Sequence, residues 1–561
     1  MSNSKIDQTN DDSLSILNVL MIIAPFFIGL APDGWALMAG AVIAIALIVT
    51  VLMNKRFIIQ KDPSLLFLTI LAITALITIF TGISSGDSFI GALRYLSALL
   101  WALLTLQMPP QKREDALLYL PSVALLMLVV SAALFFFPDT RSFITNGNNR
   151  LAGFFQYANT FALFLLLGFA IYMEKMASQD SFIKQILYAI VFLTGILWTG
   201  SRLTLGLTAL FMIFSFVKQK DLRRCYLVLF AATAAILVII LIIAGIAKNP
   251  FYRLIDVSGS TFYGRLIYYQ DALKIIAKHP LGLGYKGYWL VQAACQSAPY
   301  STLYVHNGYL QCMLDNGWLA GIALILLLIR MISKSERTGR LLAIMIAIHI
   351  FFDFDLSYLY IWWIVVLLIP WNQKDKEIHP ASGIVTAGVF LAASLLLIPA
   401  SFTSMFSQYE KSYHILPSSL SNEILYMSTE EDLDQQVSLA KNVLSRYPDC
   451  GLAYDVLANA DEEKNDYVQM VADKRQGLLL QKYKEEEYDQ YLQMLAEALK
   501  YFEETNNTES KEKCLSFLQE FPSIISDAQS NLNLLNQSTV DHMDFSIAEN
   551  AKSLLKEYGL N

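Results

Sequence analysis

The stretch Val305-His306-Asn307-Gly308-Tyr309-Leu310 closes the longest polar loop in the apolar part of this chain and opens a helix. That helix continues through Asp315-Asn316-Gly317 into the apolar run GIALILLLI. Almost everything before the loop reads as apolar helix, whereas the chain after residue 405 is charged and water-soluble in character. Polar chemistry should therefore gather at this loop, and the first question is which face of a membrane it occupies.

Composition places the chain in a membrane. Apolar residues make up 55% of the 561 residues and charged residues only 16%, which is outside the range of an ordinary soluble domain. A membrane-spanning helix needs about 20 largely apolar residues. We therefore predict an all-α polytopic bundle of about 12–13 spans, from thirteen candidate stretches at 14–31, 35–53, 64–82, 88–106, 116–137, 153–173, 182–199, 203–217, 225–247, 311–330, 340–355, 357–370 and 383–404.

Charge divides the chain into parts with different solvents. Residues 1–420 hold 29 Lys or Arg against 21 Asp or Glu, a net charge of +8, whereas residues 421–561 hold 12 against 27, a net charge of −15. We predict a polar N-terminal tail at 1–12, a transmembrane domain at 13–404 and a soluble domain at 405–561. The acidic domain argues against nucleic acid as a partner, because phosphate backbones repel it.

The five cysteines do not have the spacing of a metal site, so we infer neither a metal nor a cofactor. Cys450 and Cys514 could form a disulfide, and the sequence does not decide this point.

Lys and Arg collect in alternate connections, which the positive-inside rule assigns to the cytoplasm together with the N-terminus. These basic connections carry Lys55, Arg56, Lys61, Lys112, Arg113, Lys175, Lys184, Lys218, Lys220, Arg223, Arg224, Lys334, Arg337, Arg340, Lys374 and Lys376. The remaining connections are then extracytoplasmic, at 32–34, 83–87, 138–152, 200–202, 248–306, the bend near 356 and everything after 405. The large loop 248–306 and the acidic domain therefore share the outer face.

The acidic domain has apolar residues at helical spacing in segments 432–448, 451–471 and 485–502, which predicts helices. Ala440, Leu444 and Pro448, followed by Tyr454, Leu457 and Ala458, resemble the junction between two tetratricopeptide (TPR) helix pairs. An irregular helical bundle fits the pattern equally well. Either arrangement suits a docking surface for a partner protein better than a catalytic centre.

Several arginines lie where the positive-inside rule predicts few cations, namely Arg141, Arg150, Arg202, Arg253 and Arg265. Guanidinium groups bind phosphate through a fixed fork of donors, so arginines on an outer face suggest a pyrophosphate ligand. Any single one could instead snorkel to the interface or pair with Asp256 or Asp271. The set argues for a site, because Arg202 and Arg265 come from distant parts of the chain.

His306 is one of six histidines, and a neutral imidazole at a membrane edge can accept a proton from a hydroxyl group. It could instead merely cap the following helix, as could Asn307. Arg94, Asp353 and Asp355 lie within predicted spans, where charged groups are expensive and are usually paired or functional. A structural pair between Arg94 and an aspartate is as good an interpretation as a catalytic role.

These motifs, in their order along residues 60–370, resemble the O-antigen ligase and O-antigen polymerase family. The likeness is carried by Arg150-Leu-Ala-Gly153 running into FFQYANTFALFL, by Gly200-Ser201-Arg202 opening a helix, by Arg265 followed by YYQDALKIIAKHPLGLGY, by His306 to Leu310 with Asp315 and Gly317, and by Asp353-Phe354-Asp355.

The resemblance implies a multi-span glycosyltransferase of the GT-C type, inverting and metal-independent, in a bacterial cytoplasmic membrane. Its donor would be a glycan linked to a polyprenyl pyrophosphate, and its acceptor a glycan, a lipid or a protein. Arg202 and Arg265 would hold the pyrophosphate, and His306 would activate the acceptor hydroxyl as the catalytic base. Arg150, Asn307, Arg94 and Asp353 are the supporting candidates.

Two questions stay open from the sequence. The motifs do not separate a ligase, which attaches a finished chain, from a polymerase, which joins one lipid-linked chain to another; the acidic docking domain favours a polymerase slightly. A polysaccharide or lipid transporter and a non-catalytic membrane scaffold are the alternatives from other classes. A transporter should show corresponding interrupted spans in two halves, and the sequence shows none by inspection.

Overall fold

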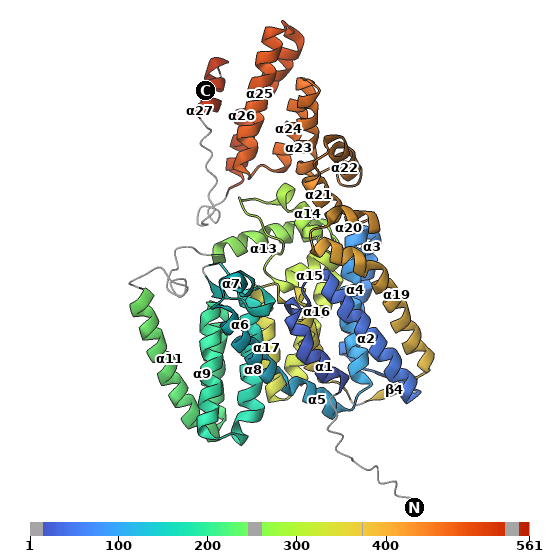
Figure 1. The fold of residues 1–561 in the computed structure, drawn as a ribbon, viewed down its shortest axis with the longest axis vertical. Helices are drawn as coiled ribbons and strands as arrows, with labels where there is room; N and C mark the ends of the chain where they lie inside the picture. Colours follow the sequence, from blue (N-terminus) through green and yellow to red (C-terminus); the bar gives the residue numbers. More distant parts are fainter. Residues whose placement is uncertain (1–14, 148, 245–260, 373, 533–548, 560–561) are drawn as a thin grey trace, which may run out of the picture.

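The computed structural model describes residues 15–147, 149–244, 261–372, 374–532 and 549–559 (Figure 1). It is a bundle of helices with a stack of further helices standing on one end. The bundle contains α1 (Ile16–Ile23), α2 (Asp33–Asn54), α3 (Pro63–Thr81), α4 (Ser85–Leu106), α5 (Pro110–Leu118), α6 (Leu120–Leu134), α7 (Pro138–Ile144), α8 (Ala158–Ile171), α9 (Phe182–Thr199), α10 (Arg202–Lys218), α11 (Arg223–Ala244), α13 (Thr261–Lys278), α14 (Gly287–Cys295), α15 (Gly308–Asn316), α16 (Trp318–Lys334), α17 (Arg337–Phe352), α18 (Leu359–Leu367) and α19 (Pro380–Met405).

The described part of the chain confirms an all-α polytopic membrane protein. Seven of its helices are long and apolar enough to cross a membrane, or up to eight if the bent pair formed by α10 and the first part of α11 counts as one span. Its strands form two short antiparallel pairs, β1 (Phe57–Gln60) with β4 (Asp375–Ile378) and β2 (Thr145–Asn146) with β3 (Arg150–Leu151).

Fewer helices qualify as spans than the about 12–13 predicted, because several apolar stretches are broken or short. The stretch 311–330 is divided at Gly317, whose φ of 84° lies in the left-handed region that favours glycine. A Cβ atom at this position would lie only 2.6 Å from the Pro280 carbonyl oxygen. The stretch 357–370 contains α18, a helix of only 9 residues that is buried on all sides. A helix that is apolar all round belongs in a protein interior as readily as in lipid, and composition does not separate the two.

Aromatic packing fixes α18 in the middle of the bundle. The indole rings of Trp101 on α4 and Trp363 on α18 stack with centroids 4.6 Å apart, and Trp101 Nε1 donates to the Trp363 carbonyl oxygen at 3.1 Å. α8 is also buried along almost its whole length. These interior helices position the loops at both ends of the bundle.

Side chains next to the helix ends cap them, and one capping residue, Asp62, also joins two helices. The carboxylate of Asp62 caps α3 by accepting a hydrogen bond from the Ser64 backbone N–H at 2.8 Å. The same carboxylate accepts from Arg330 Nη2 of α16 at 2.6 Å. A buried pair of this kind fixes α16 against α3 at the end of the bundle away from His306.

The connections predicted to be cytoplasmic meet at one end of the bundle, and those predicted to be extracytoplasmic meet at the other end. At one end β1 pairs with β4, and Lys175 Nζ contacts Glu336 at 2.9 Å; both interactions join predicted cytoplasmic connections. At the other end the Gly86 N–H donates to the Ser418 carbonyl oxygen at 3.0 Å, which joins two predicted outer segments. The sorting into two ends is a property of the structure, and the assignment of one end to the cytoplasm stays a prediction from the Lys and Arg pattern.

The C-terminal helices are α20 (Tyr409–Ile415), α21 (Leu420–Thr429), α22 (Leu433–Arg446), α23 (Gly451–Glu463), α24 (Tyr467–Leu480), α25 (Glu485–Glu504), α26 (Thr508–Ser530) and α27 (Glu549–Glu557). From α20 to α26 each helix packs against the next, which fits a TPR-like array and an irregular bundle alike. The first helices share an apolar core with α13, α14 and α15. The stack is therefore seated on the bundle (Figure 1).

All five cysteines lie in the described part of the chain, and all five are free. Cys450 belongs to the core shared with α14, whereas Cys514 lies in the core around α25 and α26. The disulfide considered from the sequence is therefore absent.

Candidate active site

Asp353 is the centre of a polar network at the end of the bundle that carries the C-terminal helices. It caps the C-terminus of α17 and is 2% exposed. Its Oδ1 accepts from the hydroxyl of Tyr157 at 2.9 Å and lies 3.3 Å from His306 Nδ1. Its Oδ2 accepts from Asn159 Nδ2 at 2.7 Å and from Arg265 Nη2 at 3.5 Å. One buried carboxylate thus joins α8, α13, α17 and the loop before α15.

The backbone of His306 is held in an unusual conformation. Its φ of 53° is left-handed, which costs a residue with a side chain on the order of 1 kcal/mol. The hydroxyl of Tyr269 donates to the His306 carbonyl oxygen at 2.8 Å. Burial raises the pKa of Tyr269 to about 12, so this hydroxyl stays a donor. The ring of Phe354 packs edge-on against the imidazole with centroids 5.0 Å apart.

Asn307, not His306, caps α15. The side-chain oxygen of Asn307 accepts from the backbone N–H groups of Tyr309 and Leu310, both at 3.0 Å. The imidazole of His306 instead contacts the carboxylate of Asp353, and the His306 side chain is 21% exposed. The helix-cap interpretation of His306 is therefore replaced by an oriented, accessible histidine, and Asn307 supports the site by fixing the start of the helix.

Arg150 is buried and supports Asp353 indirectly. Its Nη2 donates to Asn159 Oδ1 at 2.6 Å, and Asn159 in turn donates to Asp353. Its Nε donates to the carbonyl oxygen of Thr199, the last residue of α9, at 2.7 Å. Arg150 therefore links the turn between α9 and α10 to the carboxylate at the centre of the network.

Arg202 is exposed and is the first residue of α10, on that same turn. The turn is also attached to α17, because the hydroxyl of Thr204 lies 3.1 Å from His349 Nε2. His349 Nδ1 lies 2.6 Å from Asp355 Oδ2. Two independent connections, through Thr199 and through Thr204, thus bring the start of α10 to the end of the bundle that holds Asp353.

The described chain therefore contains two histidine–aspartate pairs, His306 with Asp353 and His349 with Asp355. The two pairs differ in how deeply their side chains are buried. The side chains of His349 and Asp355 are 1% and 0% exposed, so no substrate can reach that pair. His306 is accessible. We assign the inner pair to structure and keep His306 as the candidate that can touch a substrate.

Arg265 on α13 combines charge with partial accessibility, since its side chain is 18% exposed. Burial lowers the pKa of Arg265, but the Asp353 carboxylate and nearby groups raise it by more, to above the ordinary arginine value. Arg265 is therefore a permanent cation beside His306.

Arg94 has a structural partner, as one of its two interpretations predicted. Its Nη1 contacts Asp33 Oδ1 at 3.0 Å, and its Nη2 donates to the Ser357 carbonyl oxygen. Lys286 Nζ lies 3.1 Å from the other oxygen of Asp33. Arg94 and Phe354 both line a cavity of about 40 Å³, so this ion cluster adjoins the site.

Arg141 and Arg253 are the remaining predicted arginines. Arg253 lies outside the described residues. Arg141 donates to the Phe135 carbonyl oxygen at 3.0 Å and lies over the Phe135 ring. Asp271, considered as an arginine partner, instead accepts from the Ser297 N–H at 2.8 Å.

Sequence reasoning assigned no role in the site to Tyr157, Asn159, Tyr269, Lys286 and His349. Asn159 and Tyr157 stand inside the quoted motif FFQYANTFALFL, where polar residues in an apolar run are the available signal. Lys286 lies in the Gly-rich stretch 282–287, which matches a dinucleotide-binding fingerprint only in its spacing, because no strand precedes it.

Comparison with known proteins adds one finding. Residues 187–325 match the O-antigen ligase family, which confirms the resemblance seen in the motifs. The matched segment contains Arg202, Arg265 and His306, whereas Arg150 and Asp353 lie outside it. No curated protein matches the chain.

Proposed function

We propose that this membrane protein, which carries an O-antigen ligase domain, moves a glycan from a polyprenyl-pyrophosphate carrier to an acceptor hydroxyl on the outer face of the membrane. The observation that carries the proposal is an accessible imidazole held by a buried carboxylate beside a permanent cation. These are His306, Asp353 and Arg265.

His306 would act as the general base. With the Nδ1 proton directed at Asp353, the lone pair of Nε2 is available to an acceptor hydroxyl. The acceptor oxygen attacks the anomeric carbon and its proton passes to Nε2, while the bond from that carbon to the pyrophosphate oxygen breaks. The configuration at the carbon inverts, and Asp353 stabilises the imidazolium that forms. Asp353 is in this scheme a positioning residue.

Arg265 and Arg202 would bind the pyrophosphate and stabilise the charge that develops on it as it leaves. The Arg265–Asp353 contact is long at 3.5 Å and uses one terminal nitrogen, so the remaining N–H groups of the guanidinium can serve a phosphate. Arg202 lies on a turn that Arg150 and His349 hold in place. In this scheme the two arginines neutralise the charge on the leaving pyrophosphate, as a bound metal ion does in other phosphate sites.

Of the two members of this reaction class, we favour a polymerase for a cell-surface polysaccharide. The acidic C-terminal helices share a core with α13, which also bears Arg265. A protein docked on them would be held close to the proposed site. A ligase would need no such partner for chain extension.

The experiment is the substitution His306→Ala in cells, with His414→Ala as a matched control. His414 is 62% exposed on the C-terminal domain and remote from Asp353 in sequence. A transferase should lose product and accumulate lipid-linked donor on the outer leaflet, whereas a transporter would strand it inside and a scaffold would be indifferent. Chains arrested at one repeat indicate a polymerase, and full-length unattached chains indicate a ligase.

A further inference from the structure

The two carboxylate oxygens of Asp353 serve different sides of the proposed reaction. Oδ1 accepts from the Tyr157 hydroxyl at 2.9 Å and lies 3.3 Å from His306 Nδ1. Oδ2 accepts from Asn159 Nδ2 at 2.7 Å and from Arg265 Nη2 at 3.5 Å. One oxygen therefore faces the proposed base, and the other faces a proposed pyrophosphate-binding arginine.

The contact with Arg265 is the longest of the hydrogen bonds that the structure gives to this carboxylate. Its 3.5 Å lies beyond the usual N–H···O range of about 2.7–3.2 Å. The Arg265 side chain is 18% exposed, whereas that of Asp353 is 2% exposed. Solvent therefore reaches the arginine and hardly reaches the aspartate, so a phosphate that enters the site meets Arg265 first.

Asn159 holds the carboxylate independently of Arg265. Its Nδ2 donates to Asp353 Oδ2 at 2.7 Å, and its Oδ1 accepts from the buried Arg150 Nη2 at 2.6 Å. Because the arginine can only donate, it fixes which end of the amide faces Asp353. The carboxylate therefore keeps a short hydrogen bond, and its place beside His306, if Arg265 turns away.

The charge of Asp353 cannot serve both neighbours fully at once. A guanidinium beside the carboxylate offsets part of the attraction that the carboxylate exerts on a protonated imidazole. A pyrophosphate brings its own negative charges to Arg265 and offers the bidentate partner that guanidinium groups prefer. Once Arg265 has moved to the pyrophosphate, the charge of Asp353 is left to the imidazolium of His306.

We propose, on the basis of the proposed function, that Asp353 couples donor binding to activation of the base. In the free protein Arg265 rests on Asp353. The donor pyrophosphate then draws Arg265 away, Asn159 keeps the carboxylate in place, and His306 Nε2 takes the acceptor proton with the full support of Asp353. Coupling of this kind is reciprocal, so any change that frees Arg265 from Asp353 tightens pyrophosphate binding.

The test is isothermal titration of the full-length protein in detergent with farnesyl pyrophosphate, a soluble polyprenyl pyrophosphate. Asp353→Asn removes the competing charge and should tighten binding about three- to tenfold. The same variant should turn over more slowly in the transfer assay at saturating donor, a combination that loss of folding does not produce. Asp353→Glu keeps the charge and should not tighten binding.

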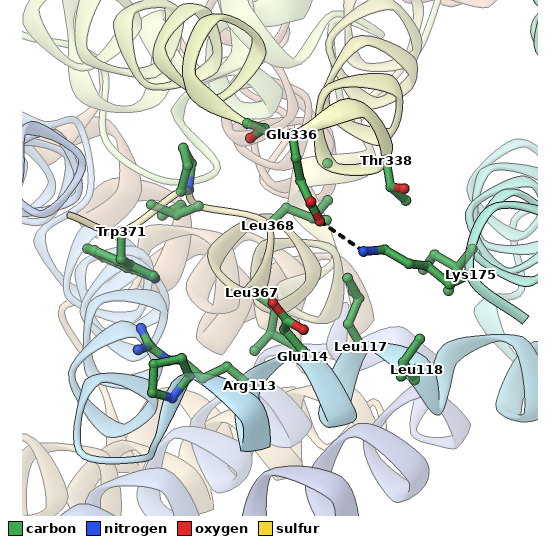
Figure 2. Close-up of a pocket in the computed structure, with 16 residues that line it drawn as sticks. Arg113, Glu114, Leu117, Leu118, Lys175, Glu336, Thr338, Leu367, Leu368 and Trp371 are labelled. Atoms are coloured by element: carbon green, nitrogen blue, oxygen red, sulfur yellow. Dashed lines mark hydrogen bonds and ion pairs between the residues drawn. The ribbon is translucent and has the colours of Figure 1, made fainter. Parts of the chain in front are cut away.

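Arg265→Gln separates the shared carboxylate from simple repulsion between Asp353 and the ligand. This variant should bind the pyrophosphate about tenfold more weakly, and adding Asp353→Asn to it should bring no tightening. Glu336→Gln is the matched control, because it makes the same change in an ion pair at the opposite end of the bundle, where Lys175 Nζ lies 2.9 Å from Glu336 Oε1 (Figure 2). It should leave the affinity unchanged.

The outcomes distinguish the coupling from the proposed function. Unchanged affinity in Asp353→Asn, or equal tightening in the Arg265→Gln background or in Asp353→Glu, would overturn the coupling and leave the proposed transfer standing. Failure of the unaltered protein to bind farnesyl pyrophosphate, or binding that Arg265→Gln leaves intact, would overturn the coupling together with the proposed donor site.

Discussion

Replacing Asp353 by Asn tests the geometry on which the proposed mechanism depends. The change keeps the size of the side chain but removes its charge and turns one acceptor oxygen into a donor. Five donors converge on this carboxylate, namely the side chains of Tyr157, Asn159, His306 and Arg265 and the backbone N–H of Phe354. An amide cannot accept from all five, so the imidazole loses its fixed orientation or Asn159 loses its partner.

The size of the effect follows from the distance. Two unit charges about 4 Å apart interact by about 4 kcal/mol at an effective dielectric near 20, which corresponds to roughly a thousandfold in rate. His306 Nδ1 lies 3.3 Å from Asp353 Oδ1, and the 21% exposure of His306 screens part of the interaction. We therefore expect transfer by Asp353→Asn to fall about 100- to 1,000-fold, because the charge on the protonated base is no longer stabilised.

The assay is glycan transfer by the purified full-length protein in nanodiscs, with lipid-linked donor and with product separated by size. Asp353→Glu, which keeps the charge, should retain more activity than the amide. Circular dichroism and size-exclusion profiles check that the helices stay folded. Activity of Asp353→Asn within about threefold of the unaltered protein, together with an inactive His306→Ala, would refute the role of Asp353 in positioning the base.

Three further predictions concern binding and stability. Arg265→Lys keeps the charge but loses the donor fork, so the KM for the donor should rise about tenfold with a smaller change in kcat; an unchanged KM would remove Arg265 from the pyrophosphate site. Burial, and then the Asp473 carboxylate, raises the pKa of Asp461 to about 6, so the folded state disfavours the ionised form and loses stability as pH rises from about 4 to about 6. Asp461→Asn should therefore stabilise the protein at pH 7.5 by roughly 0.5–1 kcal/mol after solvent screening, and not at pH 4, as thermal unfolding at both values would show. Gly317→Ala places a Cβ 2.6 Å from the Pro280 carbonyl oxygen at a φ of 84°, so it should lower the melting temperature through a loss of about 1–3 kcal/mol, and an unchanged melting temperature would argue against the break between α15 and α16.

Patterns that are local in the chain were enough to predict the fold class and the segregation of the loops. Each apolar stretch has to find an apolar environment whatever its neighbours are, and Lys and Arg mark one set of connections independently of tertiary structure. The short motifs around Arg202, Arg265 and His306 likewise identified the segment that matches the O-antigen ligase family. These inferences use only the order of residues along the chain.

Tertiary structure decided what the apolar stretches and charged residues do. α18 is an interior helix because other helices surround it, and its composition is the same as that of a span. Arg94 pairs with Asp33, 61 residues away, whereas Arg265 reaches Asp353, 88 residues away. Such partners depend on which helices lie side by side, and no local pattern encodes that choice.

The role of His306 shows most clearly which features the sequence determined and which the tertiary structure decided. The sequence alone determined that a histidine stands at the end of the longest polar loop, next to a residue able to cap a helix. Only the folded chain decided that Asn307 takes the cap and that the imidazole meets a carboxylate 47 residues away. The reason is physical: a cap is satisfied within one turn of backbone, whereas a histidine–aspartate pair needs two distant segments held in place by the packing of the whole bundle.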